Sequence, residues 1–458
     1  MASAIQAEHH SIDFIPFTER YGTPSRLFTL WFSVNLHILG VALGALGIAA
    51  GLSLGQAIIA YALGNAIGTF IMAAHAAQGP QLGIPQMIQS RAQFGVLGAA
   101  LPLAAVVVMY VLYTAADLLI MQGTMHSLFS LGRNGSLVAV ALATLVIAYI
   151  GYELIHRIGK VMTYLMSALF AAATVLLVVR HPGAAAAAAP PAHIGAAFSL
   201  ALAQAASWSF SYGPYVADYS RYLPPDISPA KTFWSTALGC FLGSTLIMAF
   251  GAYLASITPD LGANPAAAVT GLFGPLRPVA QLLLIVAIVY GNVMNLYSAY
   301  MSSATIFSGF HRMRSMGGGG KLLVMSATMA AAIMVSILSQ GNFQGYFANV
   351  LSALIYMLVP WSAINLADFY LVRKGRYDIG AMFDVDGCYG AYRWRTIAVF
   401  LIGIVAQEPF MSFTFYHGWI ASRLGADIAW VPGFLIPGAM YVLIERGRAL
   451  EPTLAQTE

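Results

Sequence analysis

One stretch decides how this chain folds: Ser207-Trp-Ser-Phe-Ser-Tyr-Gly-Pro-Tyr-Val-Ala-Asp-Tyr-Ser-Arg-Tyr222, which lies at the end of a long apolar run. Pro214 has no backbone N–H, and its ring clashes with the carbonyl group of the residue four positions earlier, Phe210. We therefore predict that a helix entering this stretch breaks beside Gly213 and Pro214. Lipid cannot pair the backbone groups that a break exposes, so such a break must be buried in protein or line a cavity.

Composition places that break inside a membrane. The chain is 59% hydrophobic and 8% charged, with a mean hydropathy of +0.76, whereas soluble domains carry about 25% charged residues. We conclude that it is a polytopic membrane protein. Helices broken at mid-membrane depth form the substrate sites of many secondary transporters. A purely structural proline kink is the alternative. The 2 cysteines give no disulfide framework or metal site, and the basic residues lie in loops, which does not suggest nucleic-acid binding.

The membrane spans can be read from the apolar runs. A spanning helix needs about 20 mostly apolar residues. Twelve runs meet this description and predict an all-α protein with twelve transmembrane helices, at 27–50, 55–77, 96–124, 136–155, 159–179, 195–217, 232–257, 277–309, 321–339, 344–371, 395–415 and 427–445.

The charges predict the orientation. If the N-terminus is cytoplasmic, all but four of the 21 Lys and Arg residues fall on the cytoplasmic side, the exceptions being Arg133, Arg180, Arg277 and Arg423. The positive-inside rule then places both termini in the cytoplasm. The predicted tails are residues 1–26 and 446–458, and the predicted location is the plasma membrane, as a prokaryotic inner-membrane protein.

Span 27–50 has irregular features five spans before the break in span 195–217. It carries Asn35, His37 and Gly40 near its middle. This weak correspondence predicts two inverted five-helix repeats, 27–179 and 195–371, with peripheral helices in 395–445. Gly40 is our candidate for a second break or gate beside Gly213 and Pro214, although glycines in membrane helices also simply permit close packing.

Ionisable groups deep in a membrane are rare and suggest function. Asp117 follows Tyr113 by one helical turn, and Tyr110 lies three residues earlier, so the three side chains share a helix face. Aromatic rings beside a carboxylate suit a flat, hydrogen-bonding solute, and a buried carboxyl group can also take up a proton. His37 is a second candidate for proton coupling. The alternative for both is a side chain satisfied by a neighbouring helix.

Span 277–309 contains the polar stripe Asn292, Asn295, Ser298 and Ser302 at helical spacing. An Asn amide offers two donors and an acceptor, which match the edge of a heterocycle. The alternative is a hydrogen-bonded seam between helices.

Several stretches, in order, resemble the purine–cytosine permease branch of the nucleobase–cation symporter family. They are Glu19-Arg-Tyr-Gly22, Trp31-Phe-Ser-Val-Asn35, Gly83-Ile-Pro-Gln-Met-Ile-Gln-Ser-Arg-Ala-Gln-Phe-Gly95, Gly98-Ala-Ala-Leu-Pro102, Ala217-Asp-Tyr-Ser-Arg-Tyr-Leu-Pro224, the Asn292 and Asn295-Leu-Tyr-Ser298 stripe, and Asn365-Leu-Ala-Asp-Phe-Tyr-Leu-Val-Arg-Lys-Gly-Arg-Tyr377.

This resemblance implies a LeuT-like fold and a substrate site between the first, third, sixth and eighth spans. It also implies that Tyr113 and Trp208 sandwich a planar nucleobase while Asn295 bonds its edge. In the family these positions of the third span commonly carry Trp and an amide, so Tyr113 and Asp117 are departures. The full set of predicted substrate-binding residues is Trp208, Phe210, Tyr113, Tyr110, Asp117, Asn292, Asn295 and Asn35.

The positions that bind sodium in sodium-coupled members correspond here to Tyr290 and Gly291, which lack a small hydroxyl group. This favours protons, with Asp117 and His37 as the coupling residues. We therefore predict a proton-coupled importer of a purine or cytosine, without cofactor or metal. One alternative is a carrier of hydantoin, allantoin, uracil or a pyrimidine vitamin precursor, with sodium as a further option for the coupling ion. A second alternative is a membrane-embedded enzyme or redox subunit. The last is disfavoured because the spans contain no pair of His residues to hold a haem.

Overall fold

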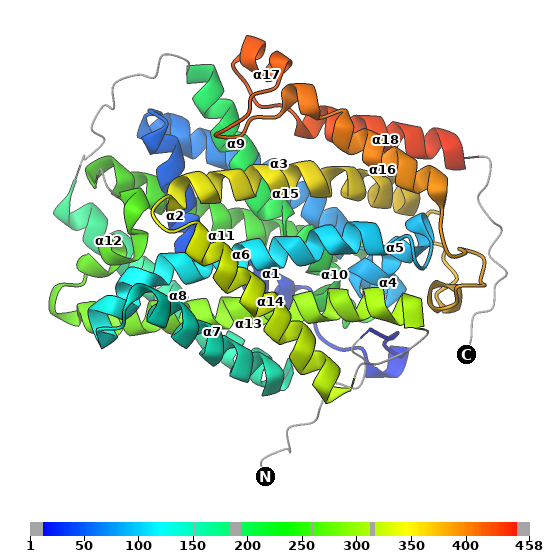
Figure 1. The fold of residues 1–458 in the computed structure, drawn as a ribbon, viewed down its shortest axis with the longest axis horizontal. Coiled ribbons are helices and arrows are strands. Elements are labelled where there is room, and N and C mark those ends of the chain that lie inside the picture. The colour runs from blue at the N-terminus through cyan, green and yellow to red at the C-terminus, as the bar shows by residue number, and fades with distance from the viewer. Residues whose placement is uncertain (1–11, 151, 183–193, 259–260, 312–316, 447–458) are drawn as a thin grey trace.

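The computed structural model describes residues 12–150, 152–182, 194–258, 261–311 and 317–446 (Figure 1). Within these ranges the regular structure is helical, and the strand-like pairing is confined to one isolated bridge between Ser412 and His417. The all-α class predicted from the apolar runs is confirmed. The predicted tail 446–458 lies, apart from Arg446, outside the described residues, as do the first 11 residues of the predicted N-terminal tail.

Eight helices in the described ranges are long and apolar enough to cross a membrane. They are α3 (Leu54–Ala76), α6 (Ala100–Phe129), α7 (Arg133–Ile150), α8 (Tyr152–Arg180), α11 (Pro229–Ile257), α13 (Arg277–His311), α14 (Gly318–Leu338) and α15 (Phe343–Leu366). Helices α1 (Ser25–Val34) and α2 (Ile38–Ala49), which are bent by 61° at the residues between them, are long and apolar enough for a ninth crossing when they are taken together as one broken span.

The three remaining predicted spans correspond to shorter helices, α9 (Ile194–Phe210), α16 (Trp394–Val405) and α18 (Trp430–Glu445). Helix α16 ends well before residue 415, where the prediction placed its end, because Pro409 lies in the 3-10 turn η7 (Glu408–Phe410). Each predicted span therefore coincides with a helix or a broken pair, while the count of twelve crossings stays a prediction.

Short elements connect the long helices. They are α4 (Gly79–Leu82), α5 (Gln86–Phe94), α10 (Val216–Ser220), α12 (Pro265–Gly271), α17 (Trp419–Leu424), the 3-10 turns η1 (Phe17–Glu19), η2 (Gly213–Tyr215), η3 (Leu261–Ala263), η4 (Gly274–Leu276) and η6 (Gly380–Phe383), and the π-helical turn η5 (Ala367–Val372).

Helix α5 is an unexpected part of the interior. All nine of its residues are buried, including Gln86, Gln89 and Gln93, although its sequence is polar. The amide of Gln93 donates to the buried carboxylate of Asp368 over 2.7 Å. Asp368 also accepts from Tyr441 at 2.8 Å. The segment between the second and third predicted spans is thus tied through Asp368, which lies in the turn after α15, to α18.

Glycines let the helices around the two breaks approach closely. A Cβ atom at Gly64 of α3 would overlap the Leu202 carbonyl oxygen of α9, and one at Gly68 would overlap that of Ala206. Gly44 of α2 faces the Met248 carbonyl oxygen of α11 in the same way. Small residues at such contacts are how membrane helices bring their backbones together. Helices α2, α3, α9 and α11 therefore form one closely packed group (Figure 1).

We expect Gly64→Val to destabilise the protein, because the added side chain must push α9 away from α3. Overpacking of this kind costs about 1–3 kcal/mol. The melting temperature of the purified protein in detergent measures the effect. Gly55→Val is the matched control, since Gly55 lies at the start of the same helix with no atom within 4 Å of an added Cβ. Equal melting temperatures for the two variants would contradict the close contact.

Candidate functional site

The two helix breaks meet at the side chain of Asn35. Its Oδ1 accepts a hydrogen bond from Trp208 Nε1 at 2.7 Å and one from the Tyr212 hydroxyl at 3.3 Å. Its Nδ2 donates to the carbonyl oxygen of Trp31 at 2.6 Å. Asn35 is fully buried, so these bonds are shielded from solvent. One amide therefore joins the end of α1 to the end of α9 and fixes the position of the Trp208 indole.

Beside this junction lies a small cavity with a volume of about 70 Å³. Its walls come from the α1–α2 break, α6, the end of α9 with the turn after it, and α13. The lining residues are Val34, His37, Leu39, Tyr113, Asp117, Trp208, Ser211, Tyr212, Tyr215, Gly291, Met294, Asn295 and Ser298. The first, third, sixth and eighth predicted spans thus meet at one place.

The aromatic rings of the cavity stand edge to face. The rings of Tyr113 and Trp208 are 5.9 Å apart between centroids, with an angle of 83° between their planes. Tyr212 meets Trp208 at 6.2 Å and also at 83°. The Tyr113 hydroxyl donates to Ser211 Oγ over 3.1 Å. In this structure the two rings do not form parallel walls, because they meet edge to face and their polar groups are hydrogen-bonded to Ser211 and Asn35.

A titratable pair lies at one side of the cavity. His37 Nε2 is 3.6 Å from Asp117 Oδ1. Asp117 is 2% exposed, and its Oδ1 has no hydrogen-bond partner. Gly291 of α13 leaves the room for the imidazole, since a Cβ atom there would be 3.2 Å from His37 Nε2. The pair therefore connects the α1–α2 break with α6, next to α13.

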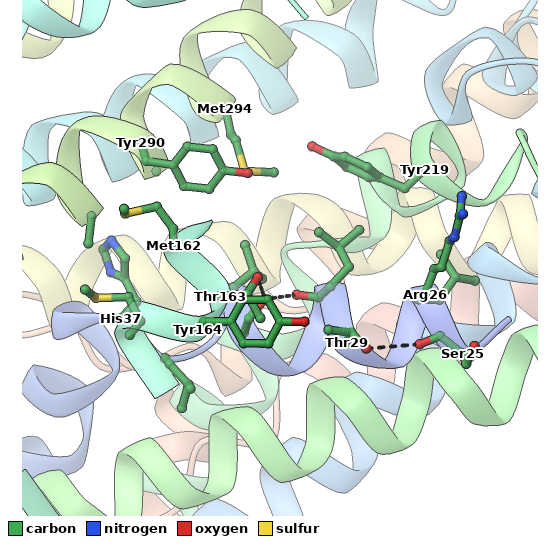
Figure 2. Close-up of a pocket in the computed structure, with 18 of the residues that line it drawn as sticks. Ser25, Arg26, Thr29, His37, Met162, Thr163, Tyr164, Tyr219, Tyr290 and Met294 are labelled. Atoms are coloured by element: carbon green, nitrogen blue, oxygen red, sulfur yellow. Dashed lines mark hydrogen bonds between the residues drawn. The ribbon is translucent and has the colours of Figure 1, made fainter. Parts of the chain in front are cut away.

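A larger vestibule of about 520 Å³ leads to the pair from the side of the N-terminal residues Tyr21 and Arg26. It shares Val34, His37, Gly291 and Met294 with the small cavity, so the two spaces adjoin. Figure 2 shows His37 at one end of the vestibule, Ser25 and Arg26 at the other, and the rings of Tyr164, Tyr219 and Tyr290 between them.

The remaining predicted site residues lie elsewhere. Tyr110 and Phe210 are buried but do not line either cavity described above, and Tyr110 packs on the Tyr215 ring at 5.7 Å. Asn292 is fully buried, and neither polar atom of its amide has a hydrogen-bond partner. Gly40 is not at a break: it lies in the first turn of α2, where an added Cβ would be 2.6 Å from Ile247. The break is at Asn35–His37 instead.

Several lining residues were not selected by sequence reasoning, among them Ser211, Tyr212 and Tyr215. All three belong to the stretch with the break, where the residues after Phe210 leave the helical arrangement. Their position directly after a predicted break was the available signal, because side chains of an irregular segment at that depth must face protein or a cavity.

This architecture defines a class of protein. A helical membrane protein in which two interrupted helices face each other across a cavity, with a wider vestibule leading to one side of it, is built as an alternating-access transporter.

Comparison with known proteins identifies the family. The model of the family described as "Permease for cytosine/purines, uracil, thiamine, allantoin" matches residues 14–433. A Bacillus subtilis (strain 168) protein named "Putative purine-cytosine permease YxlA" is 37% identical over 445 residues, which are 97% of each chain. The purine-cytosine permease fcyB of Emericella nidulans is 22% identical over 468 residues, covering 97% of this chain and 89% of fcyB. The chain belongs to this permease family. It is a transporter and not an enzyme, as the sequence predicted.

Solved structures agree on the fold. The inward-facing conformation of Mhp1 superposes with a TM-score of 0.77 at 16% identity, covering 98% of this chain and 95% of Mhp1. Mhp1, a nucleobase-cation-symport-1 family transporter, also matches in a closed conformation with bromovinylhydantoin bound, with a TM-score of 0.75 at 17% identity, covering 96% and 95%. The predicted LeuT-like fold is thereby confirmed.

We expect the bond between Asn35 and Trp208 to stabilise the site. Asn35→Ala leaves the buried indole N–H without an acceptor, which costs about 1–3 kcal/mol. In a Trp208→Phe background that N–H is absent, so Asn35→Ala should cost about 1 kcal/mol less. A double-mutant cycle on chemical unfolding in detergent measures this difference. Additive effects within about 0.5 kcal/mol would show that the two side chains do not interact.

Proposed function

We propose that this transporter imports a nucleobase, a purine or cytosine, across the plasma membrane together with a proton. The observation that carries the proposal is the lining of the small cavity, where Trp208, Tyr113, Asn295 and Asp117 come together. The printed names of its relatives, "Putative purine-cytosine permease YxlA" and the purine-cytosine permease fcyB, support the same class of substrate.

Each of these side chains matches one feature of a nucleobase. The flat faces of the base are apolar and stack on aromatic rings, which Trp208 and Tyr113 provide. Its edge carries alternating donors and acceptors, which the Asn295 amide can meet with both kinds of group. Asp117 accepts an N–H when ionised and donates an O–H when protonated. The chemistry of the cavity therefore favours a planar heterocycle over a sugar or an ion.

Substrate entry requires rearrangement. The cavity of about 70 Å³ is much smaller than typical ligand pockets, which measure about 300–1,000 Å³. The edge-to-face contact between Tyr113 and Trp208 occupies the space that a base would need. In our proposal the rings turn towards a parallel arrangement and the base takes the place between them. Side-chain rotamer changes of this kind are common on binding.

The vestibule is the proposed exit. It leads from His37 towards Arg26 and the N-terminal residues. With both termini in the cytoplasm of a prokaryotic cell, as the distribution of Lys and Arg predicts, this arrangement corresponds to an inward-open state. The base then leaves along the tyrosines that line the vestibule.

Proton coupling is the proposed driving force. The Asp117–His37 pair lies beside the cavity, and the adjoining residues Tyr290 and Gly291 offer no small hydroxyl group to a sodium ion. One proton moving down a potential of ~100 mV supplies about 2.3 kcal/mol, which corresponds to roughly 50-fold accumulation of the base. The described residues that line the small cavity include no Lys or Arg, so a bound proton can supply the positive charge that neutralises the Asp117 carboxylate.

A competition assay tests the substrate. Cells that lack their own permeases express the protein and take up labelled hypoxanthine or cytosine against a panel of unlabelled heterocycles. We expect Asn295→Ala to reduce uptake about 10- to 100-fold, because the base loses one or two hydrogen bonds of about 1–1.5 kcal/mol each. Asn134→Ala is the matched control, since Asn134 is exposed and bonded to Gln340.

The panel also contains the other substrates that the family description names, uracil, thiamine and allantoin, together with hydantoin. Uptake of one of these, with no competition by any purine or by cytosine, would contradict the proposed substrate but keep the site. A protonophore that leaves concentrative uptake intact, or a requirement for sodium, would contradict the proposed coupling.

A further inference from the structure

We infer that Asp117 alone carries the transported proton and that His37 is held neutral, as the cap of helix α2, with its Nε2–H toward that carboxylate. The inference rests on the proposed proton symport, and it assigns the two members of the pair different roles. Asp117 is the proton-binding site and His37 is a positioning residue.

The first step concerns the start of α2. His37 is the N-cap residue of this helix, with extended backbone angles of φ −129° and ψ 145°, and its Nδ1 accepts the backbone N–H of Leu39 at 3.3 Å. An N-cap side chain satisfies one of the N–H groups that a helix start leaves unpaired. That requirement applies here because Leu39 is buried, so its N–H depends on an acceptor within the protein. Nδ1 must therefore keep its lone pair.

The second step follows from the chemistry of imidazole. A neutral ring has one N–H, and because Nδ1 is the acceptor, the N–H is on Nε2. Nε2 is the atom that lies 3.6 Å from Asp117 Oδ1. A further proton on the ring would have to bind Nδ1, where it would oppose the Leu39 N–H and remove the cap. The positive end of the helix dipole at the start of α2 also disfavours a cationic ring at this place.

The third step concerns the groups around Asp117. The phenols of Tyr113 on α6 and Tyr212 after α9 line the small cavity together with Asp117, and Tyr346 on α15 lies within electrostatic reach of its carboxylate. Each phenol donates its own hydrogen bond elsewhere: Tyr113 to Ser211, Tyr212 to Asn35, and Tyr346 to the Leu112 carbonyl oxygen. From α13, Gly291 lies opposite the carboxylate, where an added Cβ would be 4.0 Å from Asp117 Oδ2, and the uncharged side chains of Asn295 and Ser298 line the same cavity.

Asp117 is thus a buried carboxylate that faces the neutral imidazole of His37 at 3.6 Å. One oxygen, Oδ1, has no hydrogen bond. A buried charge without full compensation is costly, and uptake of a proton removes that cost. With His37 neutral, the pair carries one negative charge before it takes up a proton and none afterwards.

The position of the pair links the proton to the base. His37 lines both the vestibule and the small cavity, whereas Asp117 lines the small cavity. Closing the cavity around a base also encloses the carboxylate, which is less costly once the carboxylate is neutral. Protonated Asp117 therefore favours base binding, and by linkage the affinity for the base falls as pH rises past the titration of Asp117.

The test is the affinity of purified protein for labelled hypoxanthine from about pH 5 to about pH 9. We expect the wild-type affinity to fall by up to about tenfold per pH unit, the limit for one linked proton. Asp117→Asn should bind with an affinity that no longer depends on pH. His37→Asn should keep the pH dependence with a shifted midpoint, because Asn is a good N-cap but too short to replace the imidazole beside Asp117. Asp117→Glu should keep it too.

The opposite pattern would overturn the inference: a pH-independent His37→Asn together with a pH-dependent Asp117→Asn would make the imidazole the carrier. A wild-type affinity that responds to sodium and not to pH would overturn it as well. If the wild type binds no nucleobase, the proposed function fails by itself. The roles of the two residues are then tested by melting temperatures measured without ligand over the same pH range. We expect the plot of melting temperature against pH to have the same shape for the wild type and His37→Asn, and a different shape for Asp117→Asn. A His37→Asn plot that differs in shape from the wild-type plot would contradict the inference.

Discussion

The structure depends on the need to pair backbone polar groups where two helices are interrupted inside the membrane. At the first interruption, Leu36 and His37 turn back onto the carbonyl oxygens of Ser33 and Asn35 at 3.0 and 2.8 Å. At the second, the N–H of Tyr215 reaches the carbonyl oxygen of Tyr212 at 3.2 Å. Tight turns thus pair these groups locally. Because lipid would leave them unpaired, the two breaks are stable only against each other and the cavity.

The contacts around the cavity differ on its two sides. On one side, glycines bring α2, α3, α9 and α11 into backbone contact, and such contacts leave little freedom for sliding. On the other side, α6 and α13 present tyrosine, asparagine and carboxylate side chains to the cavity. Side-chain contacts can be exchanged for contacts with a substrate, whereas close backbone contacts cannot. A motion that opens and closes the site is therefore expected between these two groups of helices.

The sequence predicted what local chemistry determines. Pro214 forces the end of α9, and length with apolarity locates the other spans, because both effects act over a few residues. The break in the first span was attributed to Gly40, but it lies at Asn35–His37, where side-chain hydrogen bonds replace backbone ones. Trp208, Tyr113, Asp117 and Asn295 were selected and do line one cavity. The burial of α5 and the bond from Trp208 to Asn35 depend on residues far apart in sequence, so no local pattern could reveal them.

His37 shows why a histidine suits the first break better than a simpler cap. Serine, aspartate or asparagine would accept the Leu39 N–H equally well. Only an imidazole offers an acceptor on one side of a rigid ring and a donor on the other, so that one side chain both starts α2 and reaches Asp117 on α6. A change in the angle between α1 and α2 must therefore move the donor relative to the carboxylate. Conversely, a change in the charge of Asp117 alters the preferred position of the ring and hence of the break. The covalent rigidity of the imidazole thus links the carboxylate of Asp117 to the geometry of the break between α1 and α2.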